Sequence, residues 1–282
     1  MSHPKTKLAL ISGGGALPVE VAGYLERIGR PYVVIRIAGL SEPELEIHYG
    51  HTLGLGDFAK LFDILASEQC HAVCMCGYVK RPDFDTMDKD HGGAQVLPGI
   101  QSAGRGGDDS LLRQVAKVIA SQGYHIEGAH EANPDLLIGS GLQAGPDPSP
   151  EAMEDAHDAL RVAAAIGALD IGQAVVVAAR ITLAVEAQEG TQAILHRVAG
   201  LPPALRGSPT SRKGVLAKLA KPIQDLRLDM PAIGVSTVED AAAAGLCGIV
   251  ARAHALLIID KAAVFQRAEE LGLFIYGHDA QP

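Results

Sequence analysis

Carboxylates in the second half of the sequence lie among lysines, an arginine and turn-forming residues. Glu186 and Glu189 lie close together, and Asp225 belongs to the segment KPIQDLRLDMP at 221–231. Carboxylate oxygens bind hard cations such as Mg²⁺, and basic side chains neutralise phosphate, so this mixture suits phosphoryl chemistry. A surface network of salt bridges has the same composition and stays the alternative. The candidate substrate contacts in this region are Thr191, Lys213 and Gln224.

A glycine cluster follows the first apolar run, in LALISGGGALP at 8–18. A glycine-rich turn from strand to helix lets a phosphate approach the backbone and meet the helix N-terminus. The dinucleotide fingerprint is absent, because the glycines are consecutive and Arg36 stands where a ribose-binding acid belongs. We predict nucleotide binding here, against the alternative of an ordinary tight turn in an open α/β sheet. The candidate contacts are Gly13, Gly14, Gly15 and Leu17.

Two adjacent cations, Lys80 and Arg81, come directly after the apolar run HAVCMCG at 71–77. Ligands of open parallel sheets bind beyond the carboxyl ends of the strands, so these cations suit a diphosphate. A solvated charged turn explains them equally well from this feature alone.

The overall composition and charge argue against several classes of protein. The net charge of −9 argues against general nucleic-acid binding. Cys74 and Cys76 alternate onto one face of a strand without zinc-ligand spacing, so we expect buried free cysteines and a reducing cytoplasm. We find no secretory signal and no run of roughly 18 apolar residues, and we expect a soluble protein.

The first half predicts a β-α-β-α-β order and hence a parallel sheet. The expected strands are 6–11, 32–37, 71–77 and 124–130, and the expected helices begin at Pro18, at 57 and at Asp108. The stretch 92–107, which contains Arg105, resembles a loop because it is rich in glycine.

The second half mixes strands and helices without a regular rhythm. We expect helices at 151–169, 237–245 and 261–271, a hairpin around Arg180, and strands at 215–221, 232–236 and 248–260. The proline- and glycine-rich segment 133–150 predicts a linker. The expected domains are therefore 1–132, which binds nucleotide, and 151–282, which is a catalytic mixed α/β domain.

The whole chain resembles the UDP-2,3-diacylglucosamine pyrophosphatases of lipid A biosynthesis, in the family unrelated to calcineurin-like metallophosphoesterases. The motifs of the first half are ISGGGALP, GYVKRPDF, GDDSLLRQV and IEGAHE. Those of the second half are ALDIGQAVVV, LAVEAQEGT, KPIQDLRLDMPAIGVSTVE and AAAGLCGIVARA. A match to one such motif would be weak evidence for the family. The occurrence of all of these motifs in the same order along the chain makes the resemblance specific.

The resemblance implies a Rossmann-like first domain and hydrolysis of a UDP-linked diacylglucosamine to UMP and a diacylglucosamine 1-phosphate, lipid X. It also implies that Asp225 serves the metal, Mg²⁺ or Mn²⁺, or the attacking water, with Glu186 and Glu189 as further candidate metal ligands. An acid is expected after EGT, but Gln192 stands there.

Two other functions stay open. A non-catalytic nucleotide-sugar-binding regulator would keep the glycine turn and would not need the acids around Asp225. A nicotinamide-dependent oxidoreductase is the other alternative, and the absence of an acidic residue that would bind the ribose of the cofactor argues against it. The sequence also leaves open whether the protein associates peripherally with the inner membrane and whether it forms a homodimer.

Overall fold

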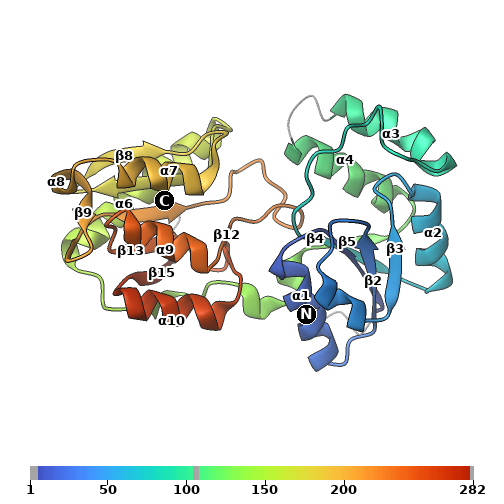
Figure 1. Cartoon of the computed structure of the whole chain (residues 1–282), viewed down its shortest axis with the longest axis horizontal. Helices are drawn as coiled ribbons and strands as arrows, with labels where there is room; N and C mark the ends of the chain where they lie inside the picture. The colour runs from blue at the N-terminus through green and yellow to red at the C-terminus, as the bar shows by residue number, and fades with distance from the viewer. Residues whose placement is uncertain (1–5, 104–107, 280–282) are drawn as a thin grey trace. The chain divides into compact units, whose positions relative to one another are not determined.

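The computed structural model describes residues 6–103 and 108–279, in two compact units (Figure 1). Unit 1 comprises Met1–Asp135 and Arg227–Asp229, and unit 2 comprises Leu136–Leu226 and Met230–Pro282. A short segment late in the chain therefore belongs to the first unit. Arg105 and the side chains of Asp108 and Asp109 lie outside the described part of the structure.

Unit 1 contains a five-stranded sheet in the order β3-β2-β1-β4-β5, and every pairing is parallel. Its strands are β1 Leu8–Ser12, β2 Tyr32–Ile37, β3 Gly50–Leu53, β4 Ala72–Cys76 and β5 His125–Glu127. Its helices are α1 Ala16–Arg27, η1 Pro43–Ile47, α2 Phe58–Ser67, α3 His91–Ala103, α4 Asp108–Ser121 and α5 Ala129–Ala132, with η3 Pro134–Leu136 at the boundary. The predicted parallel sheet of the first half is confirmed.

The helix α3 corrects the prediction of a loop at 92–107 for residues 92–103, and the remainder lies outside the described residues. Its glycines permit close packing: a Cβ on Gly92 would lie 2.6 Å from the amide nitrogen of Ala59, and one on Gly93 only 2.1 Å from the carbonyl oxygen of Gly56. Asp90 caps the helix by accepting a hydrogen bond from the amide of Gly93 at 2.7 Å. Glycine-rich sequence here marks helix packing, which a rule based on turn composition misreads.

Unit 2 is built on a six-stranded mixed sheet in the order β6-β15-β13-β11-β7-β8. Its strands are β6 Gly141–Ala144, β7 Ala174–Ala178, β8 Ile181–Val185, β11 Val215–Lys218, β13 Gly248–Arg252 and β15 Phe274–His278. Two short ladders pair β9 Gly207–Ser208 with β10 Ser211–Arg212, and β12 Ala232–Ile233 with β14 Leu257–Ile258. The strand β6 arises within the predicted linker and pairs with β15.

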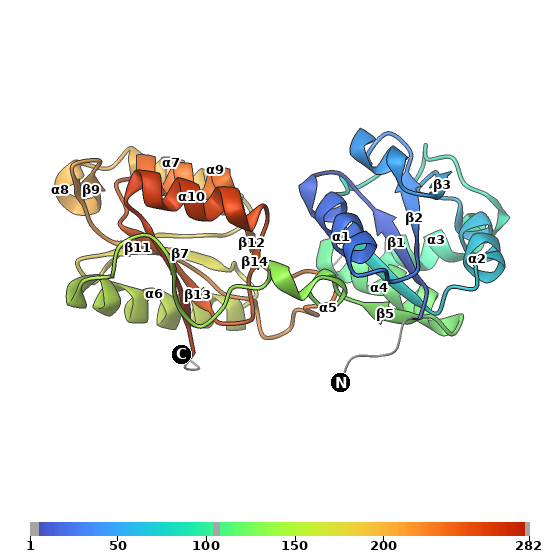
Figure 2. The same ribbon diagram turned by 90° about the horizontal axis from the view of Figure 1, so that it is seen from below.

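Helices cover both faces of this sheet (Figure 2). The helix α6 Pro150–Ala168 packs on one face, and α7 Gly190–Ala199, α9 Val235–Ala243 and α10 Lys261–Leu271 pack on the other, with α8 Pro203–Arg206 nearby in sequence. The predicted hairpin is confirmed as β7 and β8, which join through Ala179 and Arg180 at φ of 48° and 64°. Asp155 fixes this turn by accepting hydrogen bonds from both turn amides, at 3.0 and 2.6 Å.

Several predicted strands are shorter than expected, among them β11 and β12, which end at Lys218 and Ile233. The run at 248–260 is divided into β13 and β14, with His254 between them at a φ of 60°. The run at 124–130 ends early because α5 begins at Ala129. No helix in the described ranges is long and apolar enough to cross a membrane.

Candidate functional site

The glycine turn after β1 is held against the end of β4. The amide of Gly13 donates to the carbonyl of Cys76, and that of Gly14 donates to the carbonyl of Tyr78, both at 2.9 Å. A Cβ on Gly13 would lie 2.7 Å from that Tyr78 oxygen and 2.9 Å from the carbonyl carbon of Gly77. Glycine is therefore required here by the approach of another part of the chain.

Glu42 occupies the helix N-terminus where the sequence predicts a ligand phosphate. Its Oε1 accepts a hydrogen bond from the amide of Gly15 at 2.7 Å. The neighbouring Ser41 hydroxyl donates to the carbonyl of Ser12 at 2.6 Å, which holds this segment beside β1. A carboxylate satisfies the same amide and helix dipole as a phosphate would. Sequence reasoning missed Glu42 because 27 positions separate it from Gly15 and no local motif links them.

The predicted glycine turn and the predicted cations come together in unit 1. β1 lies between β2 and β4, so the ends of β1 and β4 form the point where the strand order reverses. An isolated bridge between Gly14 and Tyr78 joins the two turns there. Lys80 and Arg81 follow with exposed side chains, and Leu17 is half-buried in the first turn of α1. This edge of the sheet has the geometry that nucleotide-binding α/β folds use.

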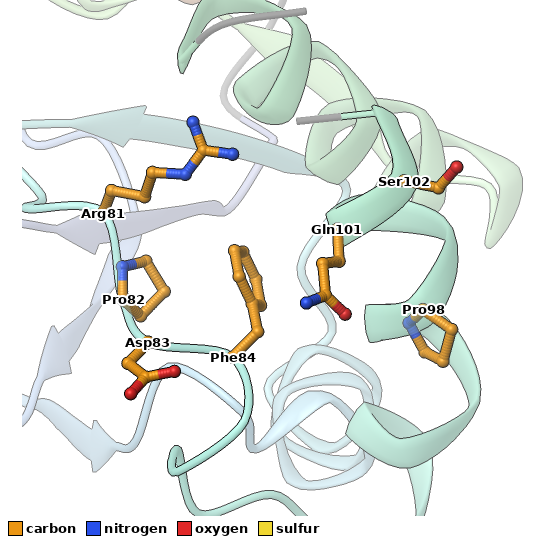
Figure 3. A pocket seen from close by; sticks show the side chains of 7 residues that line it. All are labelled: Arg81, Pro82, Asp83, Phe84, Pro98, Gln101 and Ser102. Atoms are coloured by element: carbon orange, nitrogen blue, oxygen red, sulfur yellow. The ribbon is translucent and has the colours of Figure 1, made fainter. Parts of the chain in front are cut away.

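A cavity of about 440 Å³ opens from the segment that follows β4 (Figure 3). Arg81, Pro82, Asp83, Phe84, Pro98, Gln101 and Ser102 line it. The Phe84 ring also packs against the cluster of Phe58, Leu97 and Ile100, which fixes its position. The cavity therefore combines an immobilised aromatic ring with polar groups on α3.

In unit 2, Glu186 directly follows β8 and is 5% exposed. Its Oε2 accepts a hydrogen bond from the amide of Gln173 at 3.0 Å, and its Oε1 accepts one from the hydroxyl of Thr191 at 2.8 Å. Gln173 precedes β7, and Thr191 lies in the first turn of α7. Two predicted site residues are thus in direct contact, and Glu186 links a strand to a helix.

The segment that carries Asp225 begins at the same edge of the sheet. β11 ends at Lys218, and the amide of the next residue, Leu219, donates to the carbonyl of Gln173 at 2.9 Å. Since Gln173 also donates to Glu186, the segment 219–231 starts beside this buried carboxylate. The carboxyl ends of β8 and β11 therefore place Glu186 and the start of the segment that carries Asp225 at one edge of unit 2.

Within this segment, Gln224 exchanges two hydrogen bonds with Lys221, each 3.0 Å long, and closes a turn. The next residue, Asp225, is half-buried. Lys218 is only 7% exposed, and its Nζ donates to the carbonyl of Ala232 at 2.9 Å. A buried cation thus lies at the start of the segment.

Lys213 lies at the other end of β11, so the structure does not bring it to Glu186. It precedes Gly214, which is packed against Ala178 at the hairpin. The Lys213 Nζ donates to the carbonyl of Ala204 at 2.8 Å. Its role as a substrate contact stays a prediction.

The described residues contain no group of three or more His, Cys, Asp and Glu side chains that could hold a metal ion. Glu186 already uses both oxygens inside the protein. Glu189 is exposed, and hydrogen bonds from its own amide and from that of Ala187 lower its pKa. The carboxylate oxygens of Asp225 suit a hard cation, but the described residues supply no complete cage for one.

The cysteines follow the prediction of free thiols. Cys70 and Cys74 are buried and Cys76 is half-buried, all without disulfides. Burial raises the pKa of Cys70 to about 11. The pKa of Cys74 is also raised, chiefly by its hydrogen bond with Cys76 and secondly by burial. Cys70 and Cys74 are therefore structural, because a nucleophilic cysteine needs a lowered pKa.

Comparisons with known proteins cover the chain almost completely. Residues 7–136 match the family described as the LpxI N-terminal domain, and residues 139–276 match the LpxI C-terminal domain. The UDP-2,3-diacylglucosamine pyrophosphatase LpxI of Caulobacter vibrioides is 49% identical over 275 residues, which cover 98% of each chain. A solved CobK precorrin-6A reductase aligns over 98% of this chain and 90% of its own, with 15% identity and a TM-score of 0.34, too low to support any conclusion.

Proposed function

The chain belongs to the LpxI family, and on this premise we propose that it hydrolyses the diphosphate of UDP-2,3-diacylglucosamine to UMP and 2,3-diacylglucosamine 1-phosphate, lipid X. The observation that carries the proposal is the 49% identity, across nearly the full length of both proteins, to a pyrophosphatase of that name. The protein is accordingly an enzyme that acts in lipid A biosynthesis.

We assign the nucleotide part of the substrate to unit 1. Support comes from the glycine turn at the reversal point of the parallel sheet, which is bridged to Tyr78, two residues before Lys80 and three before Arg81. We assign hydrolysis to the edge of unit 2 that carries Asp225. This segment leaves β11 after the buried Lys218, beside the residue Gln173 whose amide donates to the carboxylate of Glu186.

We propose that Asp225 orients the attacking water and takes its proton as the water oxygen bonds to phosphorus and the bridging P–O bond breaks. Mg²⁺, or Mn²⁺ in its place, would neutralise charge on the diphosphate. Mg²⁺ is commonly held by one or two carboxylates together with substrate phosphates, so Asp225 needs no cluster of three acids around it. Glu186 then acts as a positioning residue, since its oxygens are engaged by Gln173 and Thr191.

The substrate has acyl chains, so we propose peripheral contact with the cytoplasmic face of the inner membrane. Leu169 is 72% exposed and Ile223 is 49% exposed. An ion pair between Lys221 and Asp170 at 2.8 Å joins their two segments. Leu169→Asp should reduce co-sedimentation with phospholipid vesicles, and an unchanged bound fraction would oppose this placement.

The test of the function is direct. Purified protein is incubated with UDP-2,3-diacylglucosamine and Mg²⁺, and UMP is measured by chromatography. Stoichiometric release of UMP and the sugar 1-phosphate is expected. Substrate that binds and is recovered intact would instead indicate a non-catalytic nucleotide-sugar-binding regulator.

A further inference from the structure

Lys218 is a buried lysine at the point where β11 ends and the segment 219–231 begins. It is the last residue of the strand and is only 7% exposed. The two residues before it, Leu216 and Ala217, are apolar and fully buried. Burying an ammonium group costs free energy unless polar partners replace its lost hydration. A lysine at this position therefore needs a reason that apolar packing does not supply.

The hydrogen bond of Lys218 joins the two ends of the segment 219–231. Its Nζ donates to the carbonyl of Ala232 at 2.9 Å. Ala232 begins β12, which pairs with β14, so the chain returns to regular structure at this point. Asp225 lies seven positions after Lys218 and seven positions before Ala232. One buried side chain thus connects the base of the segment that has Asp225 at its midpoint.

Backbone hydrogen bonds anchor each end of the segment separately. At the start, the amide of Leu219 donates to the carbonyl of Gln173 at 2.9 Å. At the end, the amide of Leu257 donates to the carbonyl of Pro231 at 2.8 Å. The bond from Lys218 differs from both, because it sets the distance between one end and the other.

An opposite charge lies across β7 from Lys218. In the antiparallel ladder of β11 and β7, Lys218 is paired with Ala174. From the other neighbour of β7, the amide of Glu186 donates to the carbonyl of the same Ala174 at 2.8 Å. Residues that oppose one another in antiparallel strands share a face of the sheet. The buried carboxylate of Glu186 therefore lowers the cost of burying the Lys218 ammonium group.

We propose that Lys218 is a positioning residue for hydrolysis, which holds the two ends of the segment 219–231 together and thereby fixes the carboxylate of Asp225. This inference rests on the proposed function, because it supports the role assigned to Asp225. Lys218 acts through the backbone of Ala232. A segment whose ends could separate would let the carboxylate move, and a displacement of about 1 Å can cost about 100-fold in rate.

The first measurement is steady-state kinetics of Lys218→Met, which keeps an apolar stem and removes the ammonium group. We expect kcat to fall by about tenfold or more, with KM within about twofold of wild type. The matched control is Lys261→Met. Lys261 is half-buried, and its Nζ also donates to a backbone carbonyl, that of Leu137 at 2.6 Å. A loss of this purely structural contact should leave kcat unchanged.

The second measurement is hydrogen–deuterium exchange of the full-length proteins, which does not depend on activity. In Lys218→Met, amides of the segment 219–231 should exchange at least about tenfold faster than in wild type. In Lys261→Met, these amides should exchange at the wild-type rate. Circular dichroism checks that each variant is folded. If Lys218→Met does not fold, Lys218→Gln replaces it in both measurements, because it is polar but has a shorter side chain.

Wild-type exchange of the segment 219–231 in the folded Lys218 variant would overturn the proposal. So would faster exchange combined with a wild-type kcat, because Asp225 would then not need this restraint. A raised KM with unchanged kcat would also overturn it, since Lys218 would then contribute to substrate affinity. Absence of UMP release from wild-type protein would overturn the proposed function, whereas the exchange measurement would still test whether Lys218 restrains the segment.

Discussion

The hydroxyl of Thr191 donates to Oε1 of Glu186 at 2.8 Å, and this bond joins the start of α7 to the end of β8. Thr191→Val keeps the shape but leaves a buried carboxylate oxygen without this donor. We expect the free energy of unfolding to fall by about 1–3 kcal/mol, while Thr191→Ser stays close to wild type. Urea denaturation measures both variants. Equal stability of the valine and serine variants would show that the bond contributes nothing.

Asp225 is expected to act mainly in the transition state. Asp225→Asn should lower kcat by at least about 100-fold with little change in KM or stability. The matched control is Asp170→Asn, which removes an exposed partner of Lys221 from the same edge and should retain turnover. Steady-state kinetics in Mg²⁺ decide this, and near-normal kcat in Asp225→Asn would remove Asp225 from the mechanism.

The carboxylate of Asp225 and the diphosphate of the substrate predict dependence on a hard divalent cation. EDTA should abolish UMP release, and Mg²⁺ or Mn²⁺ added in excess should restore it. Circular dichroism should show no change on chelation, because the described part of the chain supplies no complete metal cage on which folding could depend. Full turnover in EDTA would contradict the metal assignment.

The stability of unit 1 should depend on pH through Glu68. This carboxylate accepts hydrogen bonds from Lys7 at 2.6 Å, His51 at 3.0 Å and Tyr49 at 2.8 Å, and these bonds lower its pKa from 4.5 to about 2. A lowered folded-state pKa contributes stability above pH 4.5, which is lost as the pH falls toward 2. Glu68→Gln should therefore be less stable than wild type at pH 7, and the difference should shrink below pH 4.5. A difference that is independent of pH would exclude this linkage.

The glycine turn should be sensitive to side-chain size because of the fold. Gly13→Ala places a Cβ 2.7 Å from the carbonyl oxygen of Tyr78, so we expect a loss of about 1–3 kcal/mol in stability. Gly23→Ala, in the middle of α1 with nothing near its Cβ, should gain about 0.5–1 kcal/mol. Thermal unfolding of the two variants gives the comparison. A stable Gly13→Ala protein with a raised KM would instead assign Gly13 to ligand approach.

Much of the fold could be predicted from the sequence because apolar runs report local structure. The runs around Leu10, Val34 and Val73 became the central strands of unit 1, and the hairpin at Arg180 was found between two apolar segments. Packing between segments that are distant in the chain leaves no comparable pattern in the sequence. Gly92 and Gly93 indicated a loop, yet they permit the close packing of α3 on Gly56 and Ala59.

The candidate site was predicted in part for the same reason. Motifs located Gly13, Lys80, Glu186 and Asp225, since each lies next to a strand end or a turn. Glu42 was missed, because its bond to Gly15 exists only once β2 and β1 are paired. The cavity lined by Phe84 and Gln101 likewise depends on a helix that the sequence did not predict.

Arg227–Asp229 belongs to unit 1, although the chain on either side of it belongs to unit 2. Leu228 packs against the apolar cluster formed by α2, α4 and the sheet of unit 1. On a translating ribosome, residues up to Asp135 emerge long before Leu228 is synthesised. The first unit can therefore complete its core only after most of the second has left the exit tunnel, and a fragment cut at residue 135 would lack that side chain permanently.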